Sequence, residues 1–224
     1  MTPLDILAIA PHPDDVELIC GGTIAKAARE GCRTGILDLT QGEMGTRGSV
    51  ELRAQEAAAA AKVLGAVVRE NLALPDSAIE NNPATRKALA MVLRRLRPQV
   101  VIAPAPRGRH PDHRIAAQLV RDGCFLAGIR KLEPSTEPHR PRKLLYAIAY
   151  REDYVKPTFV VDISADFETK LAAVACYASQ FEGVTQAGEV YPTGAPLAEV
   201  IRHQSAHYGS LIRCAYGEPF WTVV

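Results

Sequence analysis

The stretch Leu4-Asp5-Ile6-Leu7-Ala8-Ile9-Ala10-Pro11-His12-Pro13-Asp14-Asp15 joins an apolar run to a polar turn. Its first part, 4–10, is rich in the residues of buried strands and predicts a strand inside a sheet. Its second part places imidazole and carboxylate side chains where that strand ends. In open α/β sheets, ligands bind at this edge, so the stretch predicts a fold class and a site together.

A second stretch has the same design further along the chain. The apolar run Val100-Val101-Ile102-Ala103 predicts another buried strand, and Arg109-His110-Pro111-Asp112-His113 follows it closely. Because parallel strands bring their carboxyl ends to one edge of a sheet, the two polar clusters are expected to meet there.

Strand and helix patterns alternate along the chain, which is typical of parallel strands joined by right-handed crossovers. We therefore expect an α/β fold with a Rossmann-like, doubly wound, mainly parallel sheet and helices on both faces. The expected strands are 4–10, 33–39, 66–72, 100–103, 144–150 and 158–163, and the expected helices are 21–30, 49–64, 83–96, 113–127, 165–177 and 197–215, with a tail at 216–224. Residues 1–224 are expected to form a single domain, with 178–224 as a C-terminal extension packed on it.

Composition and charge narrow the class of protein. The 224 residues are 47% hydrophobic and 23% charged, as expected for a globular domain with a full core. A net charge of +1 gives no general attraction to nucleic acid or membrane, and no apolar run approaches the ~20 residues that span a bilayer. Five dispersed cysteines and the lack of a signal-peptide pattern predict a cytoplasmic protein without a disulfide framework.

Two nucleotide-binding motifs are missing from the sequence. Gly21-Gly22 does not complete a G-x-G-x-x-G fingerprint, and no P-loop is present. A dinucleotide site and a phosphoryl-transfer reaction are therefore not expected. The basic run Arg94–Arg97 fits the last turn of a helix, where cations suit the helix dipole, better than a nucleic-acid surface.

The two clusters carry the donors that a catalytic metal ion needs. Zinc accepts imidazole and carboxylate ligands, and a catalytic zinc keeps one position open for water. His12 and Asp15 are three residues apart at a strand-to-helix turn, and His113 can supply a third ligand from the second cluster. Several divalent ions accept such a set, so the choice between zinc and iron(II) stays open.

The remaining polar groups of the clusters suit proton transfer. Asp14 can take the proton of a metal-bound water, and His110 can act on the substrate from across the metal. Asp112 can hold the His110 ring and favour its protonated form. As the simpler alternative, Asp14 and Asp15 would only cap a helix. Two such clusters, each following a strand, favour the metal site.

These motifs resemble those of the LmbE-like, or PIG-L, zinc-dependent de-N-acetylases. Pro11-His12-Pro13-Asp14-Asp15-x-Glu17 is similar to the first motif of that family, and His110-Pro111-Asp112-His113 is similar to its third. Thr40-Gln41-Gly42-Glu43, together with Arg53 and Glu56, resembles its second block. The resemblance runs over nearly the whole chain.

The resemblance implies a metal-dependent hydrolase that removes the N-acetyl group from an N-acetylglucosaminyl conjugate. Tyr208-Gly209-Ser210-Leu211-Ile212 and Tyr216-Gly217-Glu218-Pro219-Phe220 resemble the bacillithiol-biosynthesis branch, which implies N-acetyl-α-D-glucosaminyl L-malate as the substrate. An inositol-linked or antibiotic-linked conjugate is the alternative substrate, and a zinc-binding protein without turnover is the non-enzymatic alternative. Family members often form hexamers, so a homo-oligomer is also implied.

Carried over by position, the resemblance also implies roles for single residues. One Zn²⁺ per chain is held by His12, Asp15 and His113, while Asp14 is the general base and His110, supported by Asp112, is the acid or oxyanion stabiliser.

Arginines are the implied ligands of the malate carboxylates. Their planar fork of donors suits carboxylate oxygens. The resemblance points to Arg53 and Arg109, with Arg140 and Tyr191 as further candidates for the pocket. The alternative for Arg53 is an ordinary pair with Glu56 on a charged helix.

Overall fold

The structure is a computed structural model that describes residues 2–148, 156–181 and 196–222. Its strands are β1 (Ile6–Ala10), β2 (Thr34–Thr40), β3 (Val68–Leu74), β4 (Val100–Pro104), β5 (Lys143–Ala147), β6 (Phe159–Asp162) and β7 (Gly217–Trp221). Its helices are α1 (Asp15–Arg29), α2 (Val50–Val63), α3 (Pro83–Leu96), α4 (Pro111–Ala127), α5 (Phe167–Ala175), α6 (Ala178–Phe181) and α7 (Leu197–Leu211), with a 3-10 turn η1 at Arg130–Leu132. None of the helices described is long and apolar enough to cross a membrane.

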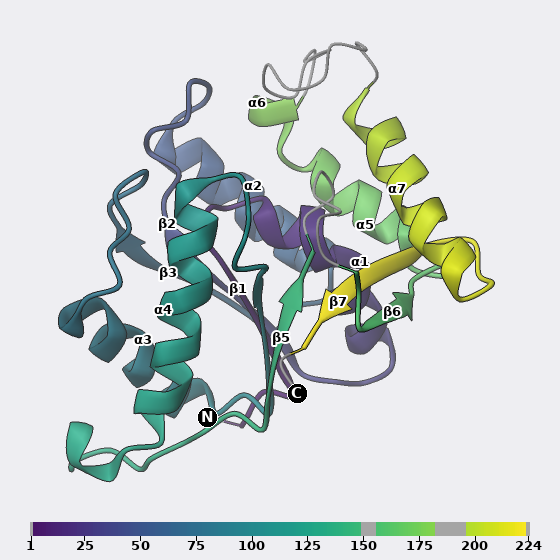
Figure 1. Cartoon of the computed structure of the whole chain (residues 1–224). Helices are drawn as coiled ribbons and strands as arrows, with labels where there is room; N and C mark the ends of the chain where they lie inside the picture. Colours follow the sequence, from purple (N-terminus) through teal and green to yellow (C-terminus); the bar gives the residue numbers. More distant parts are fainter. Residues whose placement is uncertain (1, 149–155, 182–195, 223–224) are drawn as a thin grey trace.

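The strands form one mixed sheet in the order β3-β2-β1-β4-β5-β7-β6 (Figure 1). The pairs from β3 to β5 are parallel, and β7 runs antiparallel to both of its neighbours. The expected α/β class and mainly parallel, doubly wound sheet are confirmed. The chain leaves β1 toward β2 on one side and later returns to β4 on the other, so the two clusters lie at the switch point of the sheet.

Helices cover both faces of the sheet, with α3 and α4 on one side and α1, α2 and α5 on the other (Figure 1). Strand β1 contributes side chains to the hydrophobic cores on both faces of the sheet. Leu7 and Ile9 pack in the core under α3 and α4, while Ala8 and Ala10 pack in the core under α1, α2 and α5. A strand that is buried on both faces has no polar alternation. This explains the continuous apolar run that precedes the first cluster.

Helix α1 begins earlier than expected and is broken inside. It starts at Asp15 instead of Gly21, and Cys20 has non-helical backbone angles (φ −150°, ψ 18°). Beyond the break, the N–H groups of Gly22 and Thr23 donate to the carboxylate of Glu218 at 2.9 and 2.7 Å. The glycines that were expected to open the helix therefore open its second half, whose free N–H groups are capped from β7.

The expected tail at 216–224 contains a strand. Strand β7 lies between β5 and β6, with Tyr146 opposite Trp221 and Val161 opposite Glu218. The closing segment is thus partly a member of the sheet, and the expectation of an extension packed on the domain is wrong for β7. Lys170 of α5 donates to the buried Glu218 carboxylate and ties α5 to this strand.

Candidate active site

The two polar clusters meet at the carboxyl edge of the sheet, as expected. His12 and Asp15 follow β1, and His113 lies in the first turn of α4. Asp15 joins them, because its Oδ2 lies 3.1 Å from His12 Nδ1 and its Oδ1 lies 3.1 Å from His113 Nε2. The His110 ring is also close, with its centroid 5.0 Å from that of His12.

Local contacts fix the turn after β1 and the start of α4. The backbone N–H and the hydroxyl of Thr40 both donate to the Pro11 carbonyl, at 2.8 and 3.0 Å, and tie the turn to β2. The His12 N–H donates to the Asp15 carboxylate at 2.9 Å. On the other side, Pro111 occupies the first position of α4, where a helix does not need its N–H.

The donor set of His12, Asp15 and His113 fits a metal ion. One ligand atom from each residue lies within 4.8 Å of the other two. Ligands about 2.0–2.1 Å from a tetrahedral zinc lie roughly 3.4 Å from one another, and both contacts of Asp15 are close to this value. Two imidazoles and one carboxylate also leave a coordination position open, as a catalytic site requires.

The carboxylates around these donors favour a positive charge at the site. Burial lowers the pKa of His12, but the carboxylates of Asp15, Asp14 and Asp76 outweigh it and raise that pKa to about 10. Burial raises the pKa of Asp15, yet His113 and His12 hold it well below its usual range. The site therefore attracts cations.

Asp14 lies beside the donor set in a strained backbone conformation (φ 127°, ψ −26°), which is unusual for a residue other than glycine. Burial and the adjacent Asp15 carboxylate raise the pKa of Asp14 well above its usual range, while Arg53 opposes this rise. Arg53 Nη1 lies 3.4 Å from Asp14 Oδ2 and donates to the Pro13 carbonyl at 2.9 Å. A carboxylate with a raised pKa and a fixed position suits proton transfer.

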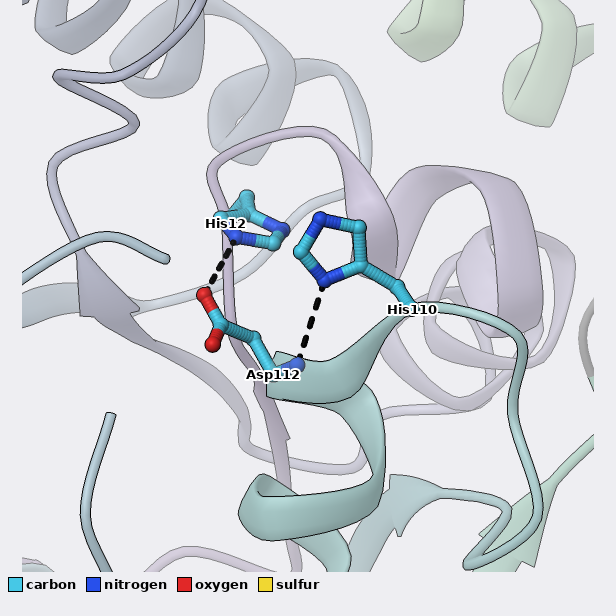
Figure 2. Close-up of side chains that lie close together, drawn as sticks. All are labelled: His12, His110 and Asp112. Atoms are coloured by element: carbon cyan, nitrogen blue, oxygen red, sulfur yellow. Dashed lines mark hydrogen bonds and ion pairs between the residues drawn. The ribbon is translucent and has the colours of Figure 1, made fainter. Parts of the chain in front are cut away.

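Asp112 contacts two histidine rings in different ways (Figure 2). Its backbone N–H donates to His110 Nδ1 at 3.2 Å, while its carboxylate Oδ2 lies 3.3 Å from His12 Nε2 and accepts the Ser77 N–H at 2.8 Å. The expectation that the Asp112 carboxylate holds the His110 ring is therefore wrong, because Oδ2 is turned toward His12 and Ser77.

The protonated form of His110 is not favoured either. Burial and the neighbouring rings of His12 and His113 lower the pKa of His110, and Asp112 offsets this only in part. Because Nδ1 accepts a backbone N–H, the neutral ring carries its proton on Nε2. His110 is thus set up as a neutral hydrogen-bond donor.

An open pocket of about 210 Å³ adjoins these groups. It is lined by His12, Asp14, Gly42, Met44, Gly45, Arg53, Asp76, Ser77 and His110. Most of the lining side chains are polar, so the pocket suits a ligand that carries hydrogen-bonding groups.

The predicted arginines Arg53 and Arg109 lie in different surroundings. Arg53 is buried in the pocket wall and contacts Asp14, while Glu56 instead accepts the N–H and the hydroxyl of Ser179, both at 2.7 Å. The simple Arg53–Glu56 pair is therefore not formed. Arg109 is exposed and directly precedes His110.

Arg140 lies far from the pocket, and its predicted place there is wrong. Its guanidinium donates to the Phe125 carbonyl at 3.2 Å and lies 4.6 Å from the centre of the Phe125 ring. Phe125 is near the C-terminal end of α4, whereas His110 precedes its N-terminus, and 17 residues of helix span about 25 Å. Tyr191 lies outside the described residues.

Two pocket residues, Asp76 and Ser77, were not predicted. Asp76 Oδ1 lies 3.0 Å from His12 Nε2, and the Ser77 N–H reaches Asp112. Both follow β3, whose carboxyl end lies at the same edge of the sheet. Pro75-Asp76-Ser77 has the composition of an ordinary turn, so its position after a third parallel strand was the available signal.

Comparisons with known proteins identify the family to which this chain is similar. A family model described as PIG-L, GlcNAc-PI de-N-acetylase, matches residues 7–124. The crystal structure of the conserved protein TT1542 from Thermus thermophilus superposes with a TM-score of 0.88 at 43% identity, over 99% of this chain and 95% of that one.

Two curated relatives carry the names of deacetylases. Diacetylchitobiose deacetylase from Thermococcus kodakarensis is 33% identical, over 95% of this chain and 80% of the relative. A probable N-acetyl-α-D-glucosaminyl L-malate deacetylase 2 from Bacillus cereus is 26% identical, over 81% of this chain and 86% of the relative.

Proposed function

The chain belongs to the PIG-L family of GlcNAc-PI de-N-acetylases, and we propose that its substrate is N-acetyl-α-D-glucosaminyl L-malate, an intermediate of bacillithiol biosynthesis. It is a deacetylase of N-acetylglucosamine-type conjugates. The metal in this proposal is zinc, one ion per chain, and the ligands are His12, Asp15 and His113.

One observation carries the catalytic part of the proposal. The pocket holds a fixed carboxylate, Asp14, and a neutral imidazole, His110, and the proposed ligand set of His12, Asp15 and His113 contains neither of them. His12, His110 and Asp112 form a second group with ligand spacing, which this proposal leaves free of metal. A protein that only stores zinc has no use for an unligated base and a hydrogen-bond donor next to the ion. A hydrolase needs both.

The chain's own groups account for the proton transfers. A zinc ion, when bound, supplies Lewis acidity at the amide carbonyl and acidifies water. Asp14 takes a proton from the attacking water, and Arg53 holds the Asp14 carboxylate in place. His110 donates its Nε2–H to the developing oxyanion. The proton held by Asp14 returns to the leaving nitrogen, so that acetate and a free amine are formed.

The malate part of the substrate rests on two supports. The segments Tyr208–Ile212 and Tyr216–Phe220 resemble the bacillithiol branch, and the Bacillus cereus relative carries the name of that activity. In this proposal Arg53 and Arg109 bind the malate carboxylates. A chitobiose, inositol-linked or antibiotic-linked N-acetylglucosamine is the competing substrate.

The test is an acetate-release assay of the zinc-loaded protein on these conjugates. We expect the highest kcat/KM for the malate conjugate, because its two carboxylates can pair with the arginines. A higher kcat/KM for diacetylchitobiose or the inositol conjugate would refute the malate assignment alone. Zinc binding without acetate release from any conjugate would support the non-catalytic alternative.

Two further parts of the proposal concern the state of the protein in the cell. The five free cysteines suit a reducing compartment, which supports a cytoplasmic location. The family resemblance supports a homo-oligomer, with a hexamer as the expected state. Light scattering of the purified protein measures its mass directly.

A further inference from the structure

His12 uses both nitrogens of its ring. Nδ1 lies on the side of Asp15, and Nε2 lies 3.0 Å from Asp76 Oδ1 and 3.3 Å from Asp112 Oδ2. A histidine that binds a metal through one nitrogen normally donates its other N–H to a carboxylate, which fixes the tautomer and the orientation of the ring. We propose that Asp76 is a positioning residue that holds His12 in place for the metal, an inference that rests on the proposed zinc-dependent function.

Asp76 and Asp112 both reach Nε2 of His12, but in different ways. The contact with Asp112 at 3.3 Å is a hydrogen bond, whereas Asp76 makes a closer ion-pair contact at 3.0 Å. The Asp112 oxygen that faces His12 also accepts the Ser77 N–H at 2.8 Å, so it is shared between two donors. The Asp76 side chain is 6% exposed, so its electrostatic attraction to the ring is little weakened by water.

A carboxylate is the group that this position needs. Oδ1 of Asp76 faces the His12 ring, and Oδ2 accepts the Met44 N–H at 2.9 Å. Both oxygens thus face N–H donors. An asparagine offers one acceptor oxygen and an NH₂ group, so it can satisfy one of the two donors and not both.

A second carboxylate fixes Asp76 itself. Glu43 Oε1 accepts the Asp76 N–H at 2.8 Å, while Oε2 lies 3.2 Å from the Gln41 nitrogen and accepts its N–H. The loops after β2 and β3 are therefore joined in both directions, since each gives a backbone N–H to a side chain of the other. This reciprocal pair keeps the Asp76 carboxylate from turning away from His12.

The test compares the zinc affinity of the full-length wild type and Asp76→Asn by competition with a chelator. We expect the dissociation constant for zinc to rise about 10–100-fold, the usual effect of losing such a partner. The absorption bands of the cobalt-substituted protein should also change as the His12 ring loses its fixed orientation. Asp122→Asn is the matched control, because Asp122 pairs with Arg86 on the surface and should leave both readouts unchanged.

Two further variants separate positioning from charge and from folding. Asp76→Glu keeps the negative charge but misplaces the oxygens, so it should also weaken zinc binding, and a wild-type affinity would overturn positioning in favour of charge alone. Glu43→Gln loosens Asp76 without touching His12 and should weaken zinc binding less. If Asp76→Asn does not fold, an unchanged affinity of Glu43→Gln overturns the proposal.

The inference and the proposed function can fail separately. If folded Asp76→Asn has normal zinc affinity and a normal cobalt spectrum while the wild type is active, only the positioning role of Asp76 is refuted. If the wild type binds no zinc, both the positioning role and the proposed zinc-dependent function are refuted.

Discussion

Asp14 and Asp15 are neighbours of the same residue type, yet their surroundings give them different chemistry. Both are largely shielded from water, with side chains 15% and 10% exposed, and this loss of hydration raises the pKa of a carboxyl. For Asp15 this effect is outweighed by His113 and His12, whereas for Asp14 it is reinforced by the charge of Asp15 itself. One carboxylate is thus kept ionised beside two imidazoles, and the other is left with affinity for a proton.

Replacing Asp14 with asparagine should separate proton transfer from metal binding. Asp14→Asn keeps the size of the side chain and leaves the donor set intact, so we expect full zinc content. Turnover should fall by about 10²–10⁴, the usual contribution of a general base. Acetate release and bound zinc are measured on the same preparation, and near-normal turnover would rule out this role for Asp14.

Site residues could be predicted from the sequence when they directly follow a recognisable strand. The proximity of His12, Asp15 and His113 could be predicted, because the carboxyl ends of parallel strands share an edge of the sheet. Asp76 could not, since its link to His12 is a contact between two loops that look like ordinary turns. Arg140 was misplaced because it was carried over by resemblance alone. It lies between the end of α4 and the start of β5, and a segment that enters a parallel strand lies at the opposite edge of the sheet from the site.

At the scale of elements, the regular helices and parallel strands were predictable and β7 was not. Gly217-Glu218-Pro219-Phe220-Trp221 contains a glycine and a proline, and proline within a strand normally indicates an edge. Here the Pro219 carbonyl accepts the Ile148 N–H, and the strand sits between two neighbours. Tertiary pairing overrides the local preference, which sequence patterns cannot register.

The two glycines beside the break in α1 differ in the room that they leave for a side chain. A Cβ at Gly22 would lie 2.7 Å from Ile163 Cδ1 and 3.0 Å from Ile163 Cβ, and the side chain of Ile163 is stiff. A Cβ at Gly21 would meet other atoms no closer than 3.5 Å. Gly22→Ala should therefore destabilise the protein by about 1–3 kcal/mol, as overpacking does.

Gly21→Ala is the control for this prediction. It should be neutral or stabilise the fold by about 0.4–1 kcal/mol, because alanine restricts the unfolded chain. Urea unfolding of the two metal-free variants measures both values. Equal stability of the two variants would show that the close approach of Ile163 is not a constraint.

At the scale of the whole molecule, the proposed metal ligands are neighbours only because the sheet is folded. His12 and Asp15 follow β1, whereas His113 begins α4, and the unfolded chain has no such cluster. A metal bound to this set should therefore stabilise the native state.

Zinc should raise the free energy of unfolding by about 2.7 kcal/mol when free zinc exceeds the dissociation constant 100-fold. Asp15→Ala, which loses the carboxylate between the two imidazoles, should show no such gain relative to its own metal-free form. Thermal or urea unfolding with and without zinc gives the comparison. A full zinc-dependent gain in Asp15→Ala would remove Asp15 from the ligand set.

The position of β7 also sets an order of events during synthesis. A chain grows from its N-terminus, and domains begin to fold as they emerge. The parallel strands β1 to β5 can pair with one another early, whereas β6 has β7 as its strand neighbour in the described sheet and must wait for it. Glu218 also caps the second half of α1, so this helix is completed only after a residue 196 positions beyond Gly22 has been synthesised.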